Sequence, residues 1–449
     1  MSIEFRLSHA GLLCGFAFCG SATALPPGED GVRVTIPVSG IADAAQGVAL
    51  DPDGNIVLAG SAGSARTALA RITPSGSLDG TFGIGGLALN DLSVNLGDTL
   101  RAIVRMQDGR YVGCGTFFSA GTATDFVVAR FMADGSLDTT FDGVGYAVTS
   151  FLQSGPGGSL FDQCNALALQ SDGKIVSAGF TAEAGPNHVA LTRHTASGAL
   201  DASFGSGGKV DISAAFGASS NSEARALAIQ PDGKLLVAGY ASGPGNFEFL
   251  VIRLNVDGTP DTSFGSDSNG IVRTPVGNGE DIANAMVLQP DGKIVLAGSA
   301  LAADGRRDFA LARYTGAGVL DATFGSGGLV TTPVGPGDDI AYALVRMPWG
   351  RLVAAGSARV STGGPGTDIA LAAYNANGTL DHYFGDGGTR MLDVSAFDDI
   401  AYGLTADISG ARLWAVGTAE PTTNQDFLAV EFGLPDTIYR NGFENGELP

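Results

Sequence analysis

The feature that most constrains this chain is a cassette that recurs seven times, about once every 60 residues. In its cleanest copy, residues 226–239, it reads A-L-A-I-Q-P-D-G-K-L-L-V-A-G. The glycines of its Asp-Gly turn, or their positional equivalents, are Gly54, Gly109, Gly173, Gly233, Gly292, Gly350 and Gly410. Their separations are 55, 64, 60, 59, 58 and 60 residues. A period this regular indicates one supersecondary unit copied end to end.

Each copy divides into four strand-sized segments. In the fifth copy, strands are predicted over residues 282–289, 293–298, 308–314 and about 329–334. Asp-Gly between the first two apolar runs is the strongest short hairpin signal, because glycine adopts the positive φ of the turn at no steric cost. Helical periodicity is absent, and glycine supplies 68 of the 449 residues. The chain is therefore predicted to be all-β.

The first and third strands of each copy are apolar on both faces, which predicts that neighbouring sheets cover both. Four-stranded antiparallel sheets stacked around an axis make a β-propeller. The last copy stops after its third strand, and residues 31–36 match a fourth strand with nothing before it. We therefore expect a seven-bladed β-propeller in which the N-terminal strand completes the last blade and protects its edge.

These motifs resemble the bacterial delta-60 repeat family. The resemblance is carried by segments such as Gln289-Pro290-Asp291-Gly292-Lys293 and, in the second turn, by residues 257–265, D-G-T-P-D-T-S-F-G, and it covers about residues 31–433. Copies six and seven depart from it at the hairpin, with residues 347–350 reading M-P-W-G and 407–410 reading D-I-S-G. The resemblance implies a β-propeller and export, and no defined activity.

Composition and the termini indicate the compartment. Residues 1–24 combine Arg6, an apolar run and the small residues Ala22 and Ala24 just before a cleavage position, which predicts a secretory signal peptide. No other stretch approaches the length of a membrane span. We expect domains at 1–24 (signal peptide), 25–434 (propeller) and 435–449 (flexible tail), in a monomer that is secreted or periplasmic. A net charge of −21, from 46 acidic and 25 basic residues, argues against nucleic acid as a partner.

The mature chain keeps two cysteines, Cys114 and Cys164. In an oxidising compartment they can pair. The alternative is two buried small apolar residues, because other copies have Ala59, Ala178 or Ala238 in the slot of Cys114.

An arginine and an aspartate recur eight residues apart around the second turn of most copies, which predicts a structural ion pair. Copy six has Ala373 in the arginine position, so we expect its aspartate, Asp381, to matter less.

A set of carboxylates lies eleven residues before the hairpin glycine, or ten in the fourth copy, where one strand group leads into the next. In a closed ring these residues would surround one mouth of the central channel and could bind Ca²⁺ or another cation. The alternative is an Asx turn that fixes each connection. The set comprises Asp43, Asp98, Asp162, Glu223, Asp281, Asp339 and Asp399.

A second set follows about three residues later and stays polar or aromatic while its identity varies. Such variation favours a mouth that contacts a ligand, and the alternative is ordinary polar satisfaction beside a wet channel. The set comprises Gln46, Arg101, Asn165, Arg225, Asn284, Tyr342 and Tyr402.

The loops after the second strands open on the same face and vary in length and content. Variable loops on a rigid scaffold are where recognition usually lies. Packing of a loop aromatic onto its own blade is the alternative. The candidate residues of this loop face are Phe117, Phe118, Tyr240, Arg306 and Arg307.

No sequence signature of an enzyme is found: there is no H-E-x-x-H, no His/Cys cluster and no G-x-S-x-G. His194 takes a slot that is aromatic or leucine in other copies, which predicts core packing. We therefore expect a non-catalytic binding scaffold for a glycan or protein partner, with no catalytic residue and no cofactor unless Ca²⁺ binds. An exported hydrolase or lyase that uses carboxylates at the mouth is the alternative.

Overall fold

The computed structural model describes residues 21–24, 32–39, 42–63, 66–93, 97–119, 123–151, 160–183, 185–212, 220–242, 246–361, 366–407, 409, 412–421 and 424–433. Predictions about residues 1–20, Gly31, Gly410 and the tail at 435–449 lie outside these ranges. No helix occurs among the described residues, and none there is available to span a membrane. The all-β prediction is confirmed.

After two N-terminal strands, β1 (Ser21–Ala24) and β2 (Val32–Ile36), the described strands form six groups of four and a last group of three. The next groups are β3 (Asp43–Leu50), β4 (Ile56–Ala62), β5 (Arg66–Ile72), β6 (Leu87–Asn90); β7 (Thr99–Arg105), β8 (Tyr111–Ser119), β9 (Ala123–Phe131), β10 (Tyr146–Thr149); and β11 (Leu160–Leu169), β12 (Ile175–Glu183), β13 (His188–His194), β14 (Lys209–Asp211). Then come β15 (Ser222–Ile229), β16 (Leu235–Ser242), β17 (Phe247–Leu254), β18 (Ile271–Thr274); β19 (Ile282–Leu288), β20 (Ile294–Leu301), β21 (Arg307–Tyr314), β22 (Leu329–Thr332); β23 (Asp339–Arg346), β24 (Leu352–Arg359), β25 (Thr367–Tyr374), β26 (Thr389–Leu392); and β27 (Asp399–Ala406), β28 (Arg412–Ala419), β29 (Asp426–Gly433).

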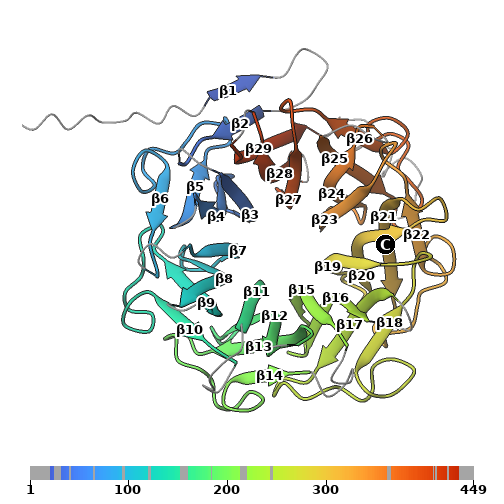
Figure 1. Cartoon of the computed structure of the whole chain (residues 1–449), viewed down its shortest axis with the longest axis horizontal. Coiled ribbons are helices and arrows are strands. Elements are labelled where there is room, and N and C mark those ends of the chain that lie inside the picture. Colours follow the sequence, from blue (N-terminus) through green and yellow to red (C-terminus); the bar gives the residue numbers. More distant parts are fainter. Residues whose placement is uncertain are drawn as a thin grey trace, which may run out of the picture.

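The strand groups form antiparallel sheets that stand around a central opening (Figure 1). Strand order runs outward in sequence order, so that β3, β7, β11, β15, β19, β23 and β27 are the innermost strands (Figure 1). A single parallel bridge, Phe161 with Thr124, joins the groups β7–β10 and β11–β14 into one eight-stranded sheet. We call each group of strands a blade.

The two ends of the repeat region meet in one sheet. Strand β2 pairs antiparallel with β29, with Val34 opposite Ala429 and Ile36 opposite Phe427. The sheet order is β1-β2-β29-β28-β27, so β2 occupies the place that the fourth strand has in other blades. Val34 and Ile36 are buried in a cluster with Trp414 and Phe427.

The hairpin turns have the conformation that their sequence requires. In the fifth copy Gly292 has φ +82°, and Gln289 donates its backbone N–H to the carbonyl of Lys293 (2.8 Å). β19 and β20 follow the predicted segments within three residues at each end. The Asp-Gly rule therefore located these hairpins correctly.

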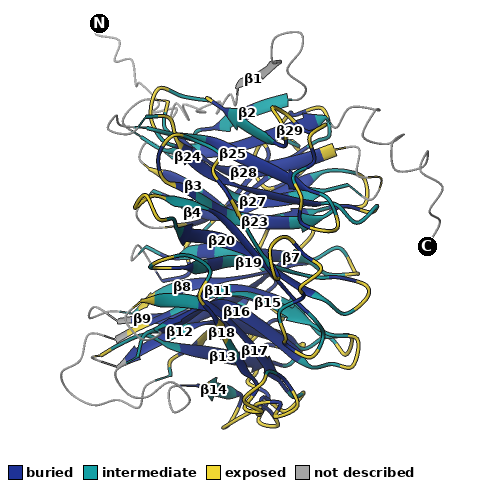
Figure 2. Cartoon of the chain, turned by 90° about the vertical axis from the view of Figure 1, so that its right-hand side faces the viewer, coloured by how far each residue is buried: buried dark blue, intermediate teal, exposed yellow. Residues whose placement is uncertain are grey.

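The core lies between blades, as expected for sheets covered on both faces. Side chains of β16 and β17, such as Leu236 and Phe249, pack with Leu296 and Ala310 of β20 and β21. Figure 2 shows the strands largely buried and the exposed residues concentrated in the connecting loops. The prediction that the first strand is buried on both faces is wrong in detail, since most of β19 is only half-buried. The reason is that an innermost strand lines the central opening.

A recurring arginine ties each of the first five blades to the following one. Arg253 pairs through Nε with Asp261 (2.7 Å), lies over the Phe264 ring (4.6 Å) and donates through Nη1 to the carbonyl of Gly316 in the following blade (2.6 Å). The same three contacts recur at Arg71, Arg130, Arg193 and Arg313. A buried guanidinium with this many partners has a structural role.

The expectation that Asp381 matters less because Ala373 replaces its arginine is not what the geometry favours. Asp381 is 2% exposed, and Arg351 of the hairpin turn reaches it (Nη1 to Oδ2, 2.7 Å). In other blades the equivalent turn residue already adds a second cation, as Lys293 does at Asp321 (3.1 Å). Copy six therefore retains the ion pair through its other partner.

Candidate functional site

Every innermost strand contains a β-bulge at the same place. In β19 the pairing with β20 shifts between Ala283 and Ala285, which leaves Asn284 without an opposite residue. A bulge of this kind re-aims one side chain and is common beside functional sites. The unpaired residues in the seven innermost strands are Gln46, Arg101, Asn165, Arg225, Asn284, Tyr342 and Tyr402.

A glycine on the neighbouring strand makes room for each bulge. A Cβ added to Gly298 would lie 1.9 Å from the carbonyl oxygen of Ile282 and 2.8 Å from Cα of Ala283. The same collision, at 1.7–1.9 Å, is met at the glycines of the other copies: Gly60, Gly115, Gly179, Gly239, Gly356 and Gly417. The last glycine of the V-A-G motif is therefore required by close backbone approach.

The seven bulge residues line one cavity of about 90 Å³ in the centre of the ring, which we call the channel cavity. They are the second polar set predicted from the sequence, and the structure brings all seven together. None of the seven is acidic and two are arginines.

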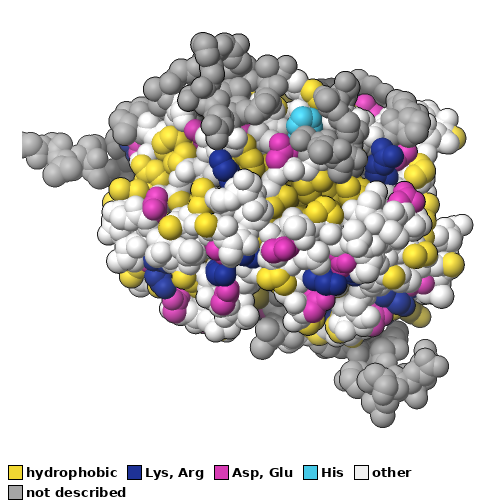
Figure 3. Space-filling model, turned by 90° about the horizontal axis from the view of Figure 1, so that it is seen from below, with side chains coloured by type: hydrophobic (Ala, Val, Ile, Leu, Met, Phe, Trp, Pro, Cys, Tyr) yellow, Lys and Arg dark blue, Asp and Glu magenta, His cyan; other side chains and the backbone are white. Residues whose placement is uncertain are grey.

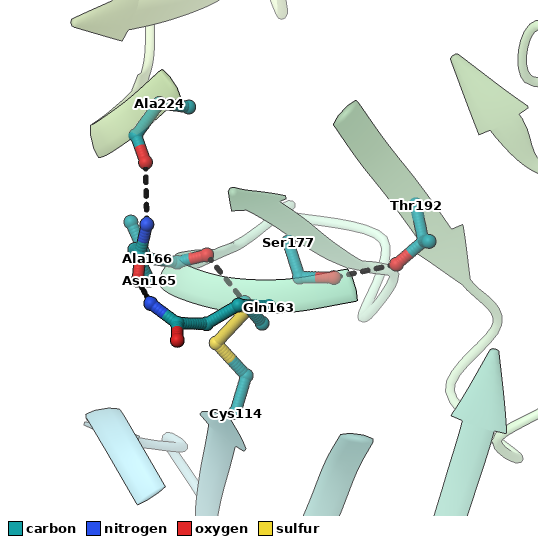
Figure 4. The surroundings of a disulfide bond; sticks show 8 residues. Cys114, Gln163, Asn165, Ala166, Ser177, Thr192 and Ala224 are labelled. Atoms are coloured by element: carbon teal, nitrogen blue, oxygen red, sulfur yellow. Dashed lines mark hydrogen bonds between the residues drawn. A yellow bond between two sulfur atoms is a disulfide. The ribbon is translucent and has the colours of Figure 1, made fainter. Parts of the chain in front are cut away.

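Neighbouring members of the channel cavity are held by hydrogen bonds. Arg101 Nη1 donates to Gln46 Oε1 (3.0 Å). Asn165 Nδ2 donates to the carbonyl of Ala224 on the next innermost strand (2.8 Å; Figure 4). Asn284 does the same to Ala341 (2.9 Å), and the rings of Tyr342 and Tyr402 lie 5.1 Å apart. Part of the set therefore has its hydrogen-bonding groups paired within the protein, as the alternative of ordinary polar satisfaction predicts.

Burial raises the pKa of Tyr342, and it raises the pKa of Tyr402 to about 12. This is the wrong direction for a tyrosine that must lose a proton to act as a base near neutral pH. The channel cavity is suited to hydrogen bonding and charge pairing.

The predicted carboxylates are buried at the start of the innermost strands, where the connections between blades end. In the fifth blade Asp281 Oδ2 accepts backbone N–H groups from Val276 (2.6 Å) and Gly277 (2.9 Å), and Asp281 is 0% exposed. The same pattern holds at Asp43, Asp98, Asp339 and Asp399, and Asp162 accepts one backbone N–H, from Phe151. These carboxylates fix the connection that precedes them, which is the structural role of the alternative, although an Asx turn would accept from the N–H two residues later and these accept from residues before them. Ca²⁺ binding there stays an untested prediction.

The fourth carboxylate of this set differs. Glu223 forms an ion pair with Arg225 (2.8 Å) and accepts from Asn187 Nδ2 (2.6 Å). It is therefore the one member whose carboxylate bonds a channel-cavity residue among the described contacts.

The candidate loop-face residues have different surroundings. Phe117 stacks on Tyr146 of its own blade (5.9 Å), and Tyr240 is buried against Phe247 (4.8 Å). Arg307 pairs with Glu280. The remaining two, Phe118 and Arg306, stay partly exposed.

A second hollow opens between the second and third blades beside the channel cavity. Its volume is about 470 Å³, and we call it the interblade pocket. Three phenylalanines, Phe118, Phe161 and Phe180, line it together with Thr99, Arg101, Thr116, Thr124, Gln163 and Asn187. Arg101 lines both hollows, so they adjoin. Phe118 and Arg101 were predicted from the sequence, whereas Phe161 and Gln163 were not. Their place at the start of an innermost strand is the signal that could have identified them.

Cys114 and Cys164 form a disulfide between β8 and β11, with Cα atoms 5.9 Å apart (Figure 4). The bond joins the second and third blades through β8 and β11, two strands that also line the interblade pocket. Of the two alternatives for these cysteines, a disulfide or two buried thiols, the structure contains the disulfide.

The repeated sheets around a central opening define a β-propeller repeat protein. The family model described as "Domain of unknown function (DUF5122) beta-propeller" matches residues 52–82, 107–141, 170–204, 230–264, 289–324 and 350–384. The segment around Asp407, where the Asp-Gly turn is lost, is not among these matches. The delta-60 name and a bacterial origin stay predictions. No curated protein matches the chain.

Several solved structures resemble the chain at low identity. One is Chaetomium thermophilum Sqt1 bound to the N-terminus of the ribosomal protein L10 (14% identity, TM-score 0.43, 89% of this chain and 100% of that chain). The RRP9 WD40 repeats give 10% identity and a TM-score of 0.46 over 92% and 100% of the two chains. The polysaccharide lyase Uly1 gives 8% identity and 0.45 over 87% and 90%.

Proposed function

We propose that this protein is an exported, seven-bladed β-propeller, closed by β2, that binds a partner at the channel cavity and interblade pocket without catalysing a reaction. The observation that carries the proposal is the bulge. The same β-bulge, with a glycine on the neighbouring strand, recurs in every blade, while the side chain at the bulge changes from blade to blade. Architecture alone would not require that variation.

Three observations support the export and closure parts. Residues 1–24 have the pattern of a signal peptide, and a disulfide suits an oxidising compartment. Strand β2 supplies β29 with an antiparallel neighbour and buries Val34. Cleavage after Ala24 removes β1 and leaves β2 in place.

A glycan suits the interblade pocket better than nucleic acid does. Aromatic side chains with a few placed amides and a charge are the usual lining of a small-ligand site. The net charge of −21 repels a phosphate backbone. Acidic and basic side chains are interspersed on the side of the ring drawn in Figure 3, which offers no broad basic surface there.

The test is retention of the mature protein in gels that contain single polysaccharides, with the reaction mixtures assayed for new reducing or unsaturated ends. We expect retention without new ends, and Phe161→Ala should abolish it. Leu89→Ala, which changes an exposed apolar residue on the outer strand β6, is the matched control. Release of ends would support the alternative, an exported hydrolase or lyase, and retention unaffected by Phe161→Ala would reject this binding face.

A further inference from the structure

One of the two arginines that line the channel cavity forms no ion pair with the described residues. Its second arginine, Arg225, is paired with Glu223 (2.8 Å). Arg101 donates to the neutral amide of Gln46, its buried Nε has no hydrogen-bond partner, and no ion pair to it occurs among the described residues. This lone cation is unexpected in a chain with a net charge of −21.

The surroundings of Arg101 disfavour its positive charge, and a bound anion would relieve that cost. Burial lowers the pKa of Arg101 and the neighbouring Arg225 lowers it further, while the carboxylate of Glu223, which is already paired with Arg225, raises it. A guanidinium that keeps free donors in a partly desolvated cavity gains most from a carboxylate, which accepts two parallel hydrogen bonds. One free guanidinium selects one negative group.

The same guanidinium borders an aromatic surface. Phe161 is 47% exposed and Phe118 36% exposed in the interblade pocket, although exposed phenylalanine is costly in water. Gln163 of this pocket donates Nε2 to Asn165 Oδ1 of the channel cavity (2.8 Å; Figure 4), so polar donors continue from one hollow to the other. A ligand that fills both needs apolar faces, hydroxyls and one acid group.

We propose that the ligand is an acidic oligosaccharide: one uronate carboxylate binds Arg101, and adjoining sugar rings lie on Phe118 and Phe161. The inference rests on the proposed glycan-binding function and names its ligand class. Sugar rings present C–H faces to the aromatic side chains, and their hydroxyls meet Gln163 and Asn187.

The test compares uronate trisaccharides (galacturonate, glucuronate, mannuronate and guluronate) with the same trisaccharides after reduction of their carboxylates to alcohols. Titration calorimetry on the mature protein should give at least about tenfold tighter binding for one acidic form, the loss expected for one charge-assisted hydrogen-bonded pair. Arg101→Gln should remove the preference, and Arg101→Lys should retain part of it. Arg66→Gln, an exposed arginine at the start of β5, is the control and should change nothing.

Two outcomes overturn the inference. One is equal affinity for the acidic and reduced forms, or an acid preference that Arg101→Gln leaves intact. The other is failure of every uronate to bind. In either case retention on neutral polysaccharides that depends on Phe161 still supports the wider proposal, so the two failures are distinguishable.

Discussion

At the scale of single residues, the most constrained position in each repeat is the glycine opposite the bulge. Gly298 has no side chain because a Cβ would lie 1.9 Å from the Ile282 carbonyl oxygen. We expect Gly298→Ala to lower the free energy of unfolding by about 2–3 kcal/mol, the usual cost of forced overpacking. Urea denaturation followed by tryptophan fluorescence measures it.

Gly80→Ala is the matched control, because a Cβ there meets nothing within 4 Å. Its free energy of unfolding should change by less than about 0.5 kcal/mol. Equal midpoints for both variants would show that the bulge does not depend on the glycine.

The ion pairs of the second turn allow a comparison between blades. Arg351→Ala leaves Asp381, which is 2% exposed, without its cation, and should cost about 3 kcal/mol of unfolding free energy. Lys293→Ala leaves Asp321 still paired with Arg313 and should cost less than about 1 kcal/mol. Urea denaturation of the two variants measures both free energies of unfolding. A loss for Arg351→Ala no larger than the loss for Lys293→Ala would support the expectation that Asp381 matters little.

At the scale of elements, the disulfide joins β8 to β11 across two blades. It closes a loop of 50 residues, so replacing both cysteines by alanine should lower the unfolding free energy by up to about 4 kcal/mol. Alanine fits, because Ala59 and Ala178 fill the slot of Cys114 in other copies. A reducing agent should lower the melting temperature of the native chain and leave that of the double variant unchanged. A native chain insensitive to reduction contradicts the expectation.

The sequence predicted those parts of the fold and of the candidate site that are encoded by residues close together in the chain or by the repeat period. The Asp-Gly turns and the repeat period located the hairpins, since both are encoded within a few residues. The period also placed Arg101 and Tyr402 in one set, because repeats put equivalent residues in equivalent places. The bulge and the burial of Asp281 depend on backbone approach between strands, which residue order does not report. The interblade pocket depends on two blades meeting, so Phe161 was missed.

At the scale of the whole molecule, pH should act through carboxylates whose charge the fold disfavours. Burial and the nearby carboxylates of Asp393 and Asp399 raise the pKa of Asp368 to about 6. A raised pKa means that the folded state holds the proton more tightly, so this residue's contribution to stability falls as pH rises from about 4 through 6.

Asp368→Asn should therefore stabilise the protein at pH 7.5, by about 0.5 kcal/mol given that the site is partly exposed to solvent. The gain should shrink towards pH 4, because there the folded carboxyl is protonated and the unfolded one, with an ordinary pKa of about 4, is itself partly protonated. Melting temperatures of the two proteins between pH 4 and 8 measure it, and parallel curves across that range would contradict the assignment.

The proposed closure of the ring is the other property of the whole molecule, and it rests on one short strand, β2. Val34 of β2 is 1% exposed and packs with Ala429 and Phe427 of β29, whereas its neighbour Thr35 is half-buried. If β2 completes the last blade, Val34→Asp buries an unpaired charge at the seam and should cost at least about 3 kcal/mol. Thr35→Asp, on the other face of the same strand, should cost less than about 1 kcal/mol. Denaturation midpoints compare the two, and limited proteolysis should cut the Val34→Asp variant first near residues 32–39. Equal midpoints would mean that the sheet of β27–β29 is stable without β2 and that the ring is open there.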